Sequence, residues 1–405
     1  MLGGQLARTV VQAAYFILVA RTLQPDAYGA FVAVSATVMI GAPFVSLGSG
    51  FIMVKHVSRD RETFPHYWNN ALVLIIASGS LLLALSVPVS RLLLPAAIPI
   101  TLVIVLGAAE LICARIIELV GQAFLAVELV KWTATLQFSL SVLRLVAIGV
   151  VTTITRHPSA VIWGIGYLAA TAIGVAVSVA TLQQKIGLPR PAFDASRLEL
   201  EEGFYFAIGL SAQTVYNDID KSLVSRFAGL EAAGIYGAAY RIIDVCFAPV
   251  SALLAATYAN FFRQGAAGLR ASLALSRRLM PTACGYAFVC SLMIVLCAPL
   301  VPIVLGDKYA STVDALRWLA PIPLLRAVHY FLADALSGAG YQRARSIVQI
   351  GIAITNVVLL AFLVPSYGWQ GAAWVSIASD ALLAISLVLV ARYLVAIADS
   401  RAASS

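Results

Sequence analysis

The sequence predicts an all-α integral membrane protein of about twelve transmembrane helices, arranged as a parallel internal repeat of two six-helix bundles. Three observations predict this fold class. Of the 405 residues, 61% are hydrophobic and 11% are charged, and the mean hydropathy is +0.92, so polar surface is too scarce to cover a soluble globule of this size. Apolar stretches of about 20 residues recur along the chain, each long enough to cross the roughly 30 Å hydrocarbon layer. The third observation is an internal repeat.

The repeat is carried by short echoes spaced at about half the chain length. Tyr28-Gly29-Ala30 returns as Tyr236-Gly237-Ala238, each time behind an arginine and ahead of a long apolar run. The sequence of residues 137–149 aligns with that of residues 349–361 at nearly the same spacing. A chain of this kind is two copies of one unit, and the interface between the copies is where we expect function.

Apolar runs between charged or Pro/Gly-rich breaks predict six helices in each half. The first six lie near 3–22, 28–54, 69–94, 97–122, 132–154 and 159–181. The second six lie near 203–227, 233–261, 279–304, 315–338, 345–365 and 370–397. The longest polar break, 183–202, is also the midpoint, and it predicts a cytoplasmic linker between an N-terminal bundle, 1–182, and a C-terminal bundle, 203–405. Two six-helix copies share one orientation, so an axis along the membrane normal relates them.

Basic residues set the expected orientation. They concentrate in the loops after the even-numbered helices and in the C-terminal tail, whereas the opposite loops carry few. Those few are Arg21, Arg91, Arg156, Arg226 and Lys308. By the positive-inside rule, both termini and the midpoint linker are cytoplasmic.

Polar side chains recur at steps of three and four residues inside five predicted helices, so the members of each set share or adjoin one helix face. A charge at the bilayer centre costs at least about 2.5 to 3.5 kcal/mol, so one that persists there faces a partner or a wet cavity. The sets are Gln5, Arg8, Gln12 and Tyr15; Thr133, Gln137, Ser141 and Arg144; Gln213, Asn217 and Asp220, with Asp218 and Lys221 beside them; Tyr236, Tyr240, Arg241 and Asp244; and Arg326, His329, Tyr330 and Asp334.

Some of these charges have a possible partner on their own helix. Glu118 follows Arg115 by three residues, and Asp244 follows Arg241 by three, so local ion pairs are an alternative to ligand binding. Arg8 has no acidic residue within reach on its own helix, which favours a cavity-lining role.

The set on the seventh helix places two acids and one base within four residues. Asp218, Asp220 and Lys221 leave at least one carboxylate to be neutralised by protonation, a bound cation or another helix. Ion coupling and a purely structural salt bridge both fit this pattern.

Several function classes find no support in the sequence. It has no GxxxxGK[ST] phosphate loop, no GxSxG and no paired carboxylates in a soluble domain, so we expect no enzyme activity. The four histidines show no metal-ligand spacing, and we read them as surface or interface residues; we predict no metal and no cofactor. Basic residues are scattered singly, which argues against nucleic acid.

Three stretches carry a family resemblance: ARTLQPDAYGAFVAVSATVM (20–39), SLGSGFIMVKHVS (46–58) and NDIDKSLVSRFAGLEAAGIYGAAYRI (217–242). They resemble the polysaccharide and O-antigen flippases of the multidrug/oligosaccharidyl-lipid/polysaccharide exporter superfamily. The resemblance implies a transporter of the bacterial inner membrane that moves a polyprenyl-diphosphate-linked oligosaccharide by alternating access, for surface polysaccharide or lipopolysaccharide synthesis. Members usually carry a basic segment before the first helix, and here only Met1 precedes it, so we expect an upstream start or weaker anchoring.

The resemblance also assigns expected roles. Arg8 and Arg241 resemble lumen arginines near the diphosphate, and Asp220-Lys221 resembles an acidic-basic pair of the seventh helix. The expected substrate-binding residues are Arg8, Gln12, Arg144, Lys221, Tyr240 and Arg241. The expected ion-coupling residues are Asp218, Asp220 and Asp244. The expected partners are the lipid-linked substrate, membrane lipids and the polysaccharide polymerase machinery.

Other readings stay open. An ion-coupled multidrug antiporter of the same superfamily would favour acids over arginines in its lumen, and this chain carries both. A polymerase would be expected to carry a large external loop, whereas the longest loop here is cytoplasmic. A major-facilitator transporter would carry a GxxxDRxGR-type pattern after the second helix, which is lacking. A membrane scaffold is the remaining alternative.

Overall fold

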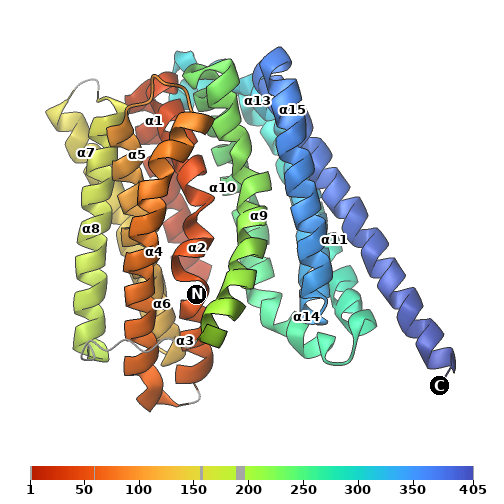
Figure 1. The fold of residues 1–405 in the computed structure, drawn as a ribbon. Helices are drawn as coiled ribbons and strands as arrows, with labels where there is room; N and C mark the ends of the chain where they lie inside the picture. Colours follow the sequence, from red (N-terminus) through yellow and green to blue (C-terminus); the bar gives the residue numbers. More distant parts are fainter. Residues whose placement is uncertain (1, 59, 156–157, 188–196, 405) are drawn as a thin grey trace. The chain divides into compact units, whose positions relative to one another are not determined.

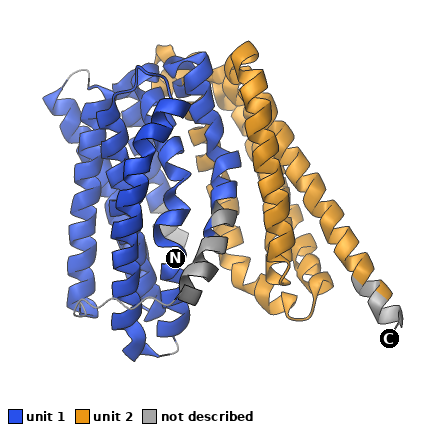
Figure 2. Ribbon diagram, in the orientation of Figure 1, with its two compact units in different colours: residues 1–234 blue, residues 235–405 orange. Residues whose placement is uncertain are grey.

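The computed structural model describes residues 2–58, 60–155, 158–187 and 197–404, with side chains for all of these except 2–7, 197–206, 208–210, 398–399 and 401–404. Within this part of the chain every regular element is a helix. The chain divides into two compact units, Met1–Gly234 and Ile235–Ser405 (Figure 2). A helix satisfies each backbone N–H and C=O internally, which is the requirement that a bilayer interior imposes.

The described part of the first unit is built from eleven helical elements (Figure 1). The longest are α1 (Leu2–Met39), α4 (Phe64–Leu93), α7 (Val130–Ile154), α8 (Ala160–Lys185) and α9 (Arg197–Ala228). The shorter ones are α2 (Ala42–Ser46), α3 (Ser49–Val57), η1 (Arg61–Thr63), α5 (Ile100–Gly107), the π-helical η2 (Ala108–Cys113) and α6 (Ala114–Ala126). Together α5, η2 and α6 make one long helical path, and α1 packs against α7 and α9.

The predicted single helix over 28–54 is not continuous. α1 is interrupted at Gln24, whose φ of 63° is left-handed, and Pro25 follows it; this break falls between the first two predicted helices. The second predicted helix then ends at Met39 and resumes as α2 and α3, which are separated by the left-handed residues Leu47 and Gly48. Pro43 stands in the first turn of α2, where its missing N–H costs nothing. The prediction of one helix here was therefore wrong.

Direct hydrogen bonds tie α9 to α1 within the first unit. The hydroxyls of Thr37 and Ser222 lie 2.9 Å apart, and the Ser211 hydroxyl donates to the Ile40 carbonyl at 2.9 Å. Arg226 at the end of α9 donates to the Leu94 carbonyl at 2.8 Å. These contacts fix both the height and the rotation of α9 against its neighbours.

The first Tyr-Gly-Ala echo marks a close approach of two backbones. A Cβ added at Gly29 would meet the Leu230 carbonyl oxygen and would lie 2.8 Å from the Gly234 nitrogen; one added at Gly234 would meet the Pro25 carbonyl. Glycine allows helix backbones to approach closely in membranes, where small residues line helix interfaces. Gly29 is therefore a packing residue.

The second unit is also entirely helical in its described part. Its elements are α10 (Leu230–Gly265), which begins in the first unit, α11 (Leu269–Cys297), η3 (Ala298–Leu300), α12 (Val301–Leu305), η4 (Asp307–Tyr309), α13 (Thr312–Leu319), α14 (Ile322–Gly338) and α15 (Gln342–Ser404). α14 packs between α11 and α15.

Two predicted helices of the second half need comment. The helix expected over 315–338 is divided into α13 and α14, and the two parts of this bent pair meet at 47°. Pro321 and Pro323 stand at the junction, where proline cannot continue a helix interior. α15 is broken at Gly368 (φ 60°), between the two helices predicted over 345–365 and 370–397.

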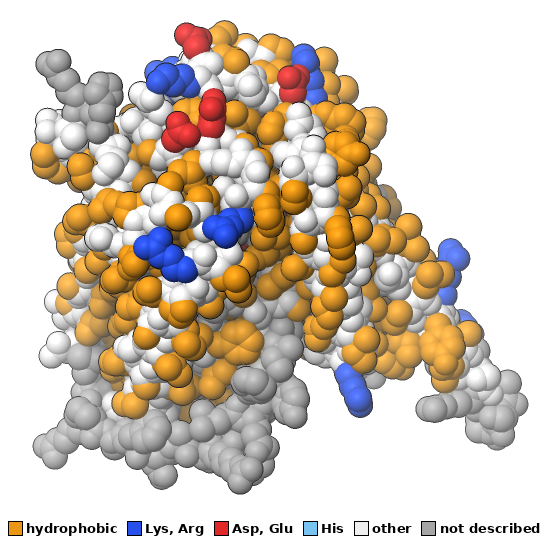
Figure 3. Space-filling model, turned by 45° about the horizontal axis from the view of Figure 1, so that its top comes forward, with side chains coloured by type: hydrophobic (Ala, Val, Ile, Leu, Met, Phe, Trp, Pro, Cys, Tyr) orange, Lys and Arg blue, Asp and Glu red, His pale blue; other side chains and the backbone are white. Residues whose placement is uncertain are grey.

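The fold class is confirmed. Seven helices of the described chain are long and apolar enough to cross a membrane, and the bent pair makes a candidate eighth. Each of the twelve predicted segments lies on helical structure. The two longest helices, α1 and α15, each carry parts of two predicted segments, which the breaks at Gln24 and Gly368 separate. Hydrophobic side chains cover most of the face seen in Figure 3, and the visible acidic side chains gather near its upper edge.

The predicted domain boundaries at 182 and 203 refer to the sequence duplication, and they stay a prediction. The compact units follow packing instead, so α9 belongs with the first unit. The middle of the expected linker, residues 188–196, lies outside the described residues.

The contact at Gly29 makes the first testable prediction. Gly29→Ala should lower stability by about 1 to 3 kcal/mol, because overpacking forces backbone shifts. Unfolding in detergent micelles, followed by circular dichroism, measures the change. Gly149→Ala in α7 is the matched control, since its Cβ would meet nothing within 4 Å. Equal midpoints for the two variants would contradict the packing role.

Candidate functional site

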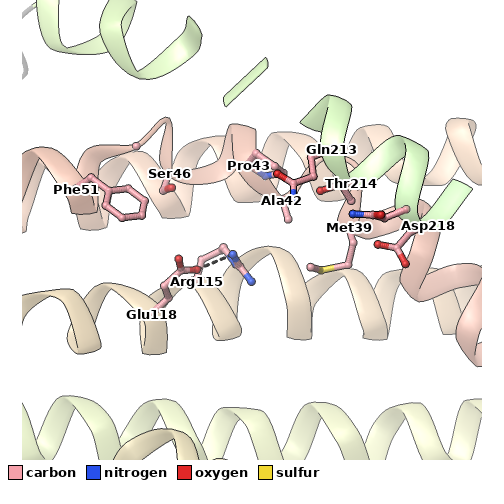
Figure 4. A pocket seen from close by; sticks show the side chains of 12 residues that line it. Met39, Ala42, Pro43, Ser46, Phe51, Arg115, Glu118, Gln213, Thr214 and Asp218 are labelled. Atoms are coloured by element: carbon pink, nitrogen blue, oxygen red, sulfur yellow. Dashed lines mark hydrogen bonds and ion pairs between the residues drawn. The ribbon is translucent and has the colours of Figure 1, made fainter. Parts of the chain in front are cut away.

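A polar cavity of about 300 Å³ lies inside the first unit (Figure 4). Its wall is formed by the end of α1, by α2 and α3, and by α6 and α9. The lining residues are Met39, Ala42, Pro43, Ser46, Gly48, Phe51, Arg115, Glu118, Gln213, Thr214, Asn217 and Asp218. Because this cavity sits within one compact unit, its geometry does not depend on the placement of the other unit.

The broken helices create this cavity. A continuous helix would fill the space beside α6 with side chains, whereas the breaks at 40–41 and 47–48 leave only short turns there. On the opposite wall, Gln213, Asn217 and Asp218 follow one another at steps that keep them on one side of α9. The hydrogen bonds between α9 and α1 hold that side toward the cavity.

Charges of both signs line the cavity. Arg115 and Glu118 form an ion pair on α6 at 2.6 Å, as the local-pair alternative predicted. Both side chains nevertheless line the cavity, and Figure 4 shows the pair facing Asp218 and Gln213 from the opposite wall. The pair therefore presents a donor and an acceptor to any molecule that enters.

The Lys221 ammonium group contacts both acids of α9. It lies 2.9 Å from Asp218 and 3.3 Å from Asp220, and it donates to the Asn217 carbonyl at 2.8 Å. The Asp220 side chain is buried, whereas that of Asp218 is 41% exposed. The structure thus joins three of the predicted site residues, Asp218, Asp220 and Lys221.

A second cluster in the first unit is centred on Glu110. Its carboxylate lies 3.6 Å from Arg144 and accepts a hydrogen bond from the Tyr167 hydroxyl. The Arg144 guanidinium stacks 4.1 Å from the centre of the Tyr167 ring and lies within 3.4 Å of the Thr171 hydroxyl. Glu110 stands on the π-helical η2, and such helical bulges are frequent at functional sites because they redirect side chains.

The second unit holds a buried network around Arg326. This guanidinium lies 2.9 Å from Asp244 on α10 and 3.8 Å from Asp380 on α15. Asp380, whose side chain is 7% exposed, also lies 3.4 Å from His329 Nε2. The Tyr240 ring covers Arg326, with its centre 5.5 Å from the guanidinium carbon. Three helices are therefore joined by one set of charges.

The remaining predicted residues lie in both units. Arg8 donates to the Gln137 side chain across α1 and α7, so two of the predicted polar stripes meet. Gln12 is half-buried on α1, one turn beyond Arg8. Arg241 is half-buried on α10 in the second unit. Whether Arg8 and Arg241 act on one ligand stays a prediction.

Two expectations are overturned. The local pair of Arg241 with Asp244 does not form in the described chain, because Asp244 pairs with Arg326. His329 was expected at a surface or interface, but it is 1% exposed, and neither ring nitrogen has a hydrogen-bond partner among the described residues. Its spacing on α14 places it beside Arg326, on the face that carries the network.

The sequence analysis did not select three residues of these clusters, Glu110, Tyr167 and Asp380. A signal for two of them was present. Asp380 is the only acidic residue of the predicted helix over 370–397, and Glu110 stands in the middle of the predicted helix over 97–122. An acid inside an apolar span normally has a partner on another helix. Tyr167 carried no such signal, because tyrosine is also an ordinary packing residue in membranes.

Comparison with known families identifies one match. A family model described as "Polysaccharide biosynthesis protein" matches residues 1–259. No curated protein sequence matches the chain.

Solved structures share the fold at low sequence identity. One is an inward-facing conformation of a multidrug resistance MATE family transporter of the MOP superfamily, at 16% identity and a TM-score of 0.81, covering 97% of this chain and 96% of that one. Another is a MOP superfamily transporter from Pyrococcus furiosus, whose binding pocket is described as having reverse polarity. It is 17% identical with a TM-score of 0.71, and the coverage is 97% and 93%. An outward-facing MATE structure has a TM-score of 0.71 at 16% identity, with 98% and 94% covered.

The network around Arg326 makes the second prediction. Arg326→Met should destabilise the protein by about 3 to 5 kcal/mol, because it leaves the buried carboxylate of Asp380 without its cationic partner. Arg326→Met combined with Asp380→Asn should cost less than the sum of the single changes, as measured by a double-mutant cycle of unfolding midpoints.

The exposed pair of Arg317 and Asp314, 3.7 Å apart, is the control for this cycle. Its coupling should stay within about 1 kcal/mol. Additive effects at Arg326 and Asp380 would show that the two groups do not interact.

Proposed function

This chain belongs to the polysaccharide biosynthesis protein family, and from that membership we propose that it is a transporter of lipid-linked oligosaccharides. The substrate is a polyprenyl-diphosphate-linked oligosaccharide, which the protein moves across the membrane by alternating access. The observation that carries the proposal is the family match itself. It covers residues 1–259, and so includes Arg8, Arg144, Lys221 and Arg241.

The chemistry of the substrate supports these residues as its binding groups. A diphosphate diester is negatively charged at every physiological pH. Arginine stays protonated and offers a rigid donor fork that suits phosphate. Arg8 and Arg241 are half-buried. The free-energy cost of placing each positive charge inside a membrane is offset when an anionic ligand binds.

The cavity of the first unit suits the sugar part of such a substrate. Sugars present hydroxyl groups that donate and accept hydrogen bonds, together with apolar C–H faces. Gln213, Thr214 and Asn217 offer amide and hydroxyl groups, and the 55% exposed Phe51 offers a ring for a C–H face. A binding role for Tyr240 and Gln12 is part of the same proposal; Tyr240 also covers Arg326.

Asp218, Asp220 and Asp244 are proposed to couple transport to an ion. The pair Asp218 and Asp220 shares one ammonium group, and Asp218 is open to the cavity. Asp244 is 46% exposed although it pairs with Arg326. A half-exposed carboxylate within a membrane-embedded helix is accessible to a proton or a metal cation, which is the property that coupling requires.

The setting follows from the proposed substrate. We place the protein in the bacterial inner membrane with both termini cytoplasmic, since lipid-linked oligosaccharides for O-antigen or other surface polysaccharide are assembled on the cytoplasmic leaflet. The product is then delivered to polymerase machinery on the other side. The excess of basic residues in the loops that follow the even-numbered predicted helices supports this orientation.

A second candidate function is an ion-coupled multidrug antiporter. It is favoured by the fold shared with a structure described as a multidrug resistance transporter, and by the half-exposed acids Asp218 and Asp244. A cationic drug would bind these acids directly. It would gain nothing from Arg8 and Arg241, which separates the two candidates.

The third prediction uses that difference. Arg8→Ala and Arg241→Ala should each reduce surface polysaccharide to below about a tenth of the wild-type level, because the diphosphate loses charge-assisted hydrogen bonds. The measurement is surface polysaccharide per cell in a strain that depends on this protein. Arg241→Lys should recover part of the loss, since it keeps the charge but not the planar fork.

Exposed arginines provide controls for this experiment. Arg91→Ala in the first unit and Arg317→Ala in the second should leave export unchanged, with membrane levels checked by immunoblot. Normal export in Arg241→Ala at normal protein level would sink the assignment.

A fourth prediction tests the antiporter directly. In cells lacking other exporters, ethidium accumulation should be the same with the wild-type protein and with Asp218→Asn. Accumulation that falls with the wild-type protein and recovers in Asp218→Asn would favour the antiporter over the oligosaccharide transporter.

A further inference from the structure

A second cavity, of about 430 Å³, lies inside the second unit and takes no part in the proposed transport site. It is enclosed by the first turns of α11, by α14 and by the end of α15. The lining residues are Leu273, Ser276, Arg277, Met280, Leu332, Val388, Ala391, Arg392, Val395 and Ala396. Two arginines therefore open onto a wall that is otherwise almost entirely apolar.

A buried hydroxyl inside this cavity points to a ligand. Ser272 on α11 donates to the Ala335 carbonyl of α14 at 2.8 Å, and so ties the two helices together. Ser276, one turn further along the same face, is 1% exposed, yet its hydroxyl has no hydrogen-bond partner among the described residues. Ser276 is one of the residues that line the cavity. Buried polar groups are normally satisfied, so a bound molecule that offers an acceptor would complete this hydroxyl.

The sequence around the two arginines has the pattern of a membrane interface. Along α15, Leu389 is 58% exposed and faces the hydrocarbon layer, Arg392 follows, and Tyr393 is 67% exposed. Exposed tyrosines at the end of an apolar span are typical of the membrane interface. On α11, Arg277 is exposed directly before the apolar part of the helix. By the loop charges, this is the cytoplasmic interface, where anionic lipids attract basic groups.

We propose that this cavity is a binding site for an anionic phospholipid of the surrounding bilayer. Arg277 and Arg392 hold the phosphate, and the Ser276 hydroxyl donates to an ester carbonyl of the glycerol backbone. The acyl chains run past Met280, Leu332 and Val388 toward the hydrocarbon layer. The volume suits the phosphoglycerol part of one lipid, since the chains stay outside in the bilayer. Such a lipid joins α11 to α15 across the cavity.

The test measures lipid binding by native mass spectrometry on the full chain, titrated with phosphatidylglycerol or phosphatidylcholine. Wild-type protein should retain one phosphatidylglycerol in preference to phosphatidylcholine. Arg277→Gln combined with Arg392→Gln should weaken phosphatidylglycerol binding about thirtyfold, since each basic residue near an anionic membrane surface changes affinity roughly fivefold. Ser276→Leu, which fills the cavity and keeps both arginines, should abolish the specific binding.

Arg270→Gln combined with Arg278→Gln is the matched control, because both residues lie on α11 outside the cavity and remove the same charge. It should bind phosphatidylglycerol as the wild type does. Equal losses in the control, no preference between the two lipids, or unchanged binding in Ser276→Leu would each overturn the site. Displacement of phosphatidylglycerol by a short-chain polyprenyl diphosphate, but not by phosphatidylcholine, would assign the cavity to substrate and overturn the proposed occupant. Because the experiment measures lipid binding, its result tests the lipid site independently of the proposed transport function.

Discussion

The absence of water from the hydrocarbon layer is the constraint on which the rest of this structure depends. It requires every backbone group to be bonded within the chain, which leaves only helices for spanning. It also requires every buried charge to find a partner, since an unpaired ion in such a medium is costly. In this protein those partners lie on other helices. Arg326 joins α10, α14 and α15, and Glu110 joins η2 to α7 and α8. Charge pairing therefore contributes to the packing alongside apolar contact.

Backbone irregularities coincide with these polar clusters. Glu110 stands on the π-helical segment, and the cavity of the first unit opens where the helix chain breaks around Leu47 and Gly48. A regular helix exposes side chains at fixed intervals of about 100°, so polar groups from several helices seldom converge on one point. A bulge or break changes the rotation of everything beyond it. The protein thus gains convergence at the sites where the ladder of backbone hydrogen bonds is interrupted.

Much of the fold was predictable from sequence, because its signals are local. Each segment predicted from apolar length and charged breaks lies on helical structure, although 28–54 and 315–338 are subdivided. The breaks at Gln24 and Gly368 fell between predicted helices. Local signals also found the Arg115–Glu118 pair. They failed for partners far apart in the chain: Tyr167 lies 57 residues from Glu110, and Arg326 lies 82 from Asp244. Helical periodicity shows which residues share a face of one helix, but not which neighbouring helix packs against that face. The subdivision of the predicted helix over 28–54 was missed for a related reason, since a left-handed Leu47 has no clear mark in the sequence.

The two acidic clusters differ in the surroundings of their carboxylates. In the first unit, Asp218 and Asp220 share Lys221, and Asp218 faces a cavity where water or a ligand group can solvate it. In the second unit, Asp380 is buried and meets both Arg326 and His329 of α14, while Asp244 of α10 meets the same Arg326. A group that is open to a cavity can exchange its counter-charge without moving a helix. The buried pair of Arg326 and Asp380 cannot, because each of its members also holds a helix in place. A change of charge in the second unit is therefore coupled to the packing of α10, α14 and α15, whereas a change in the first unit is coupled to what occupies the cavity.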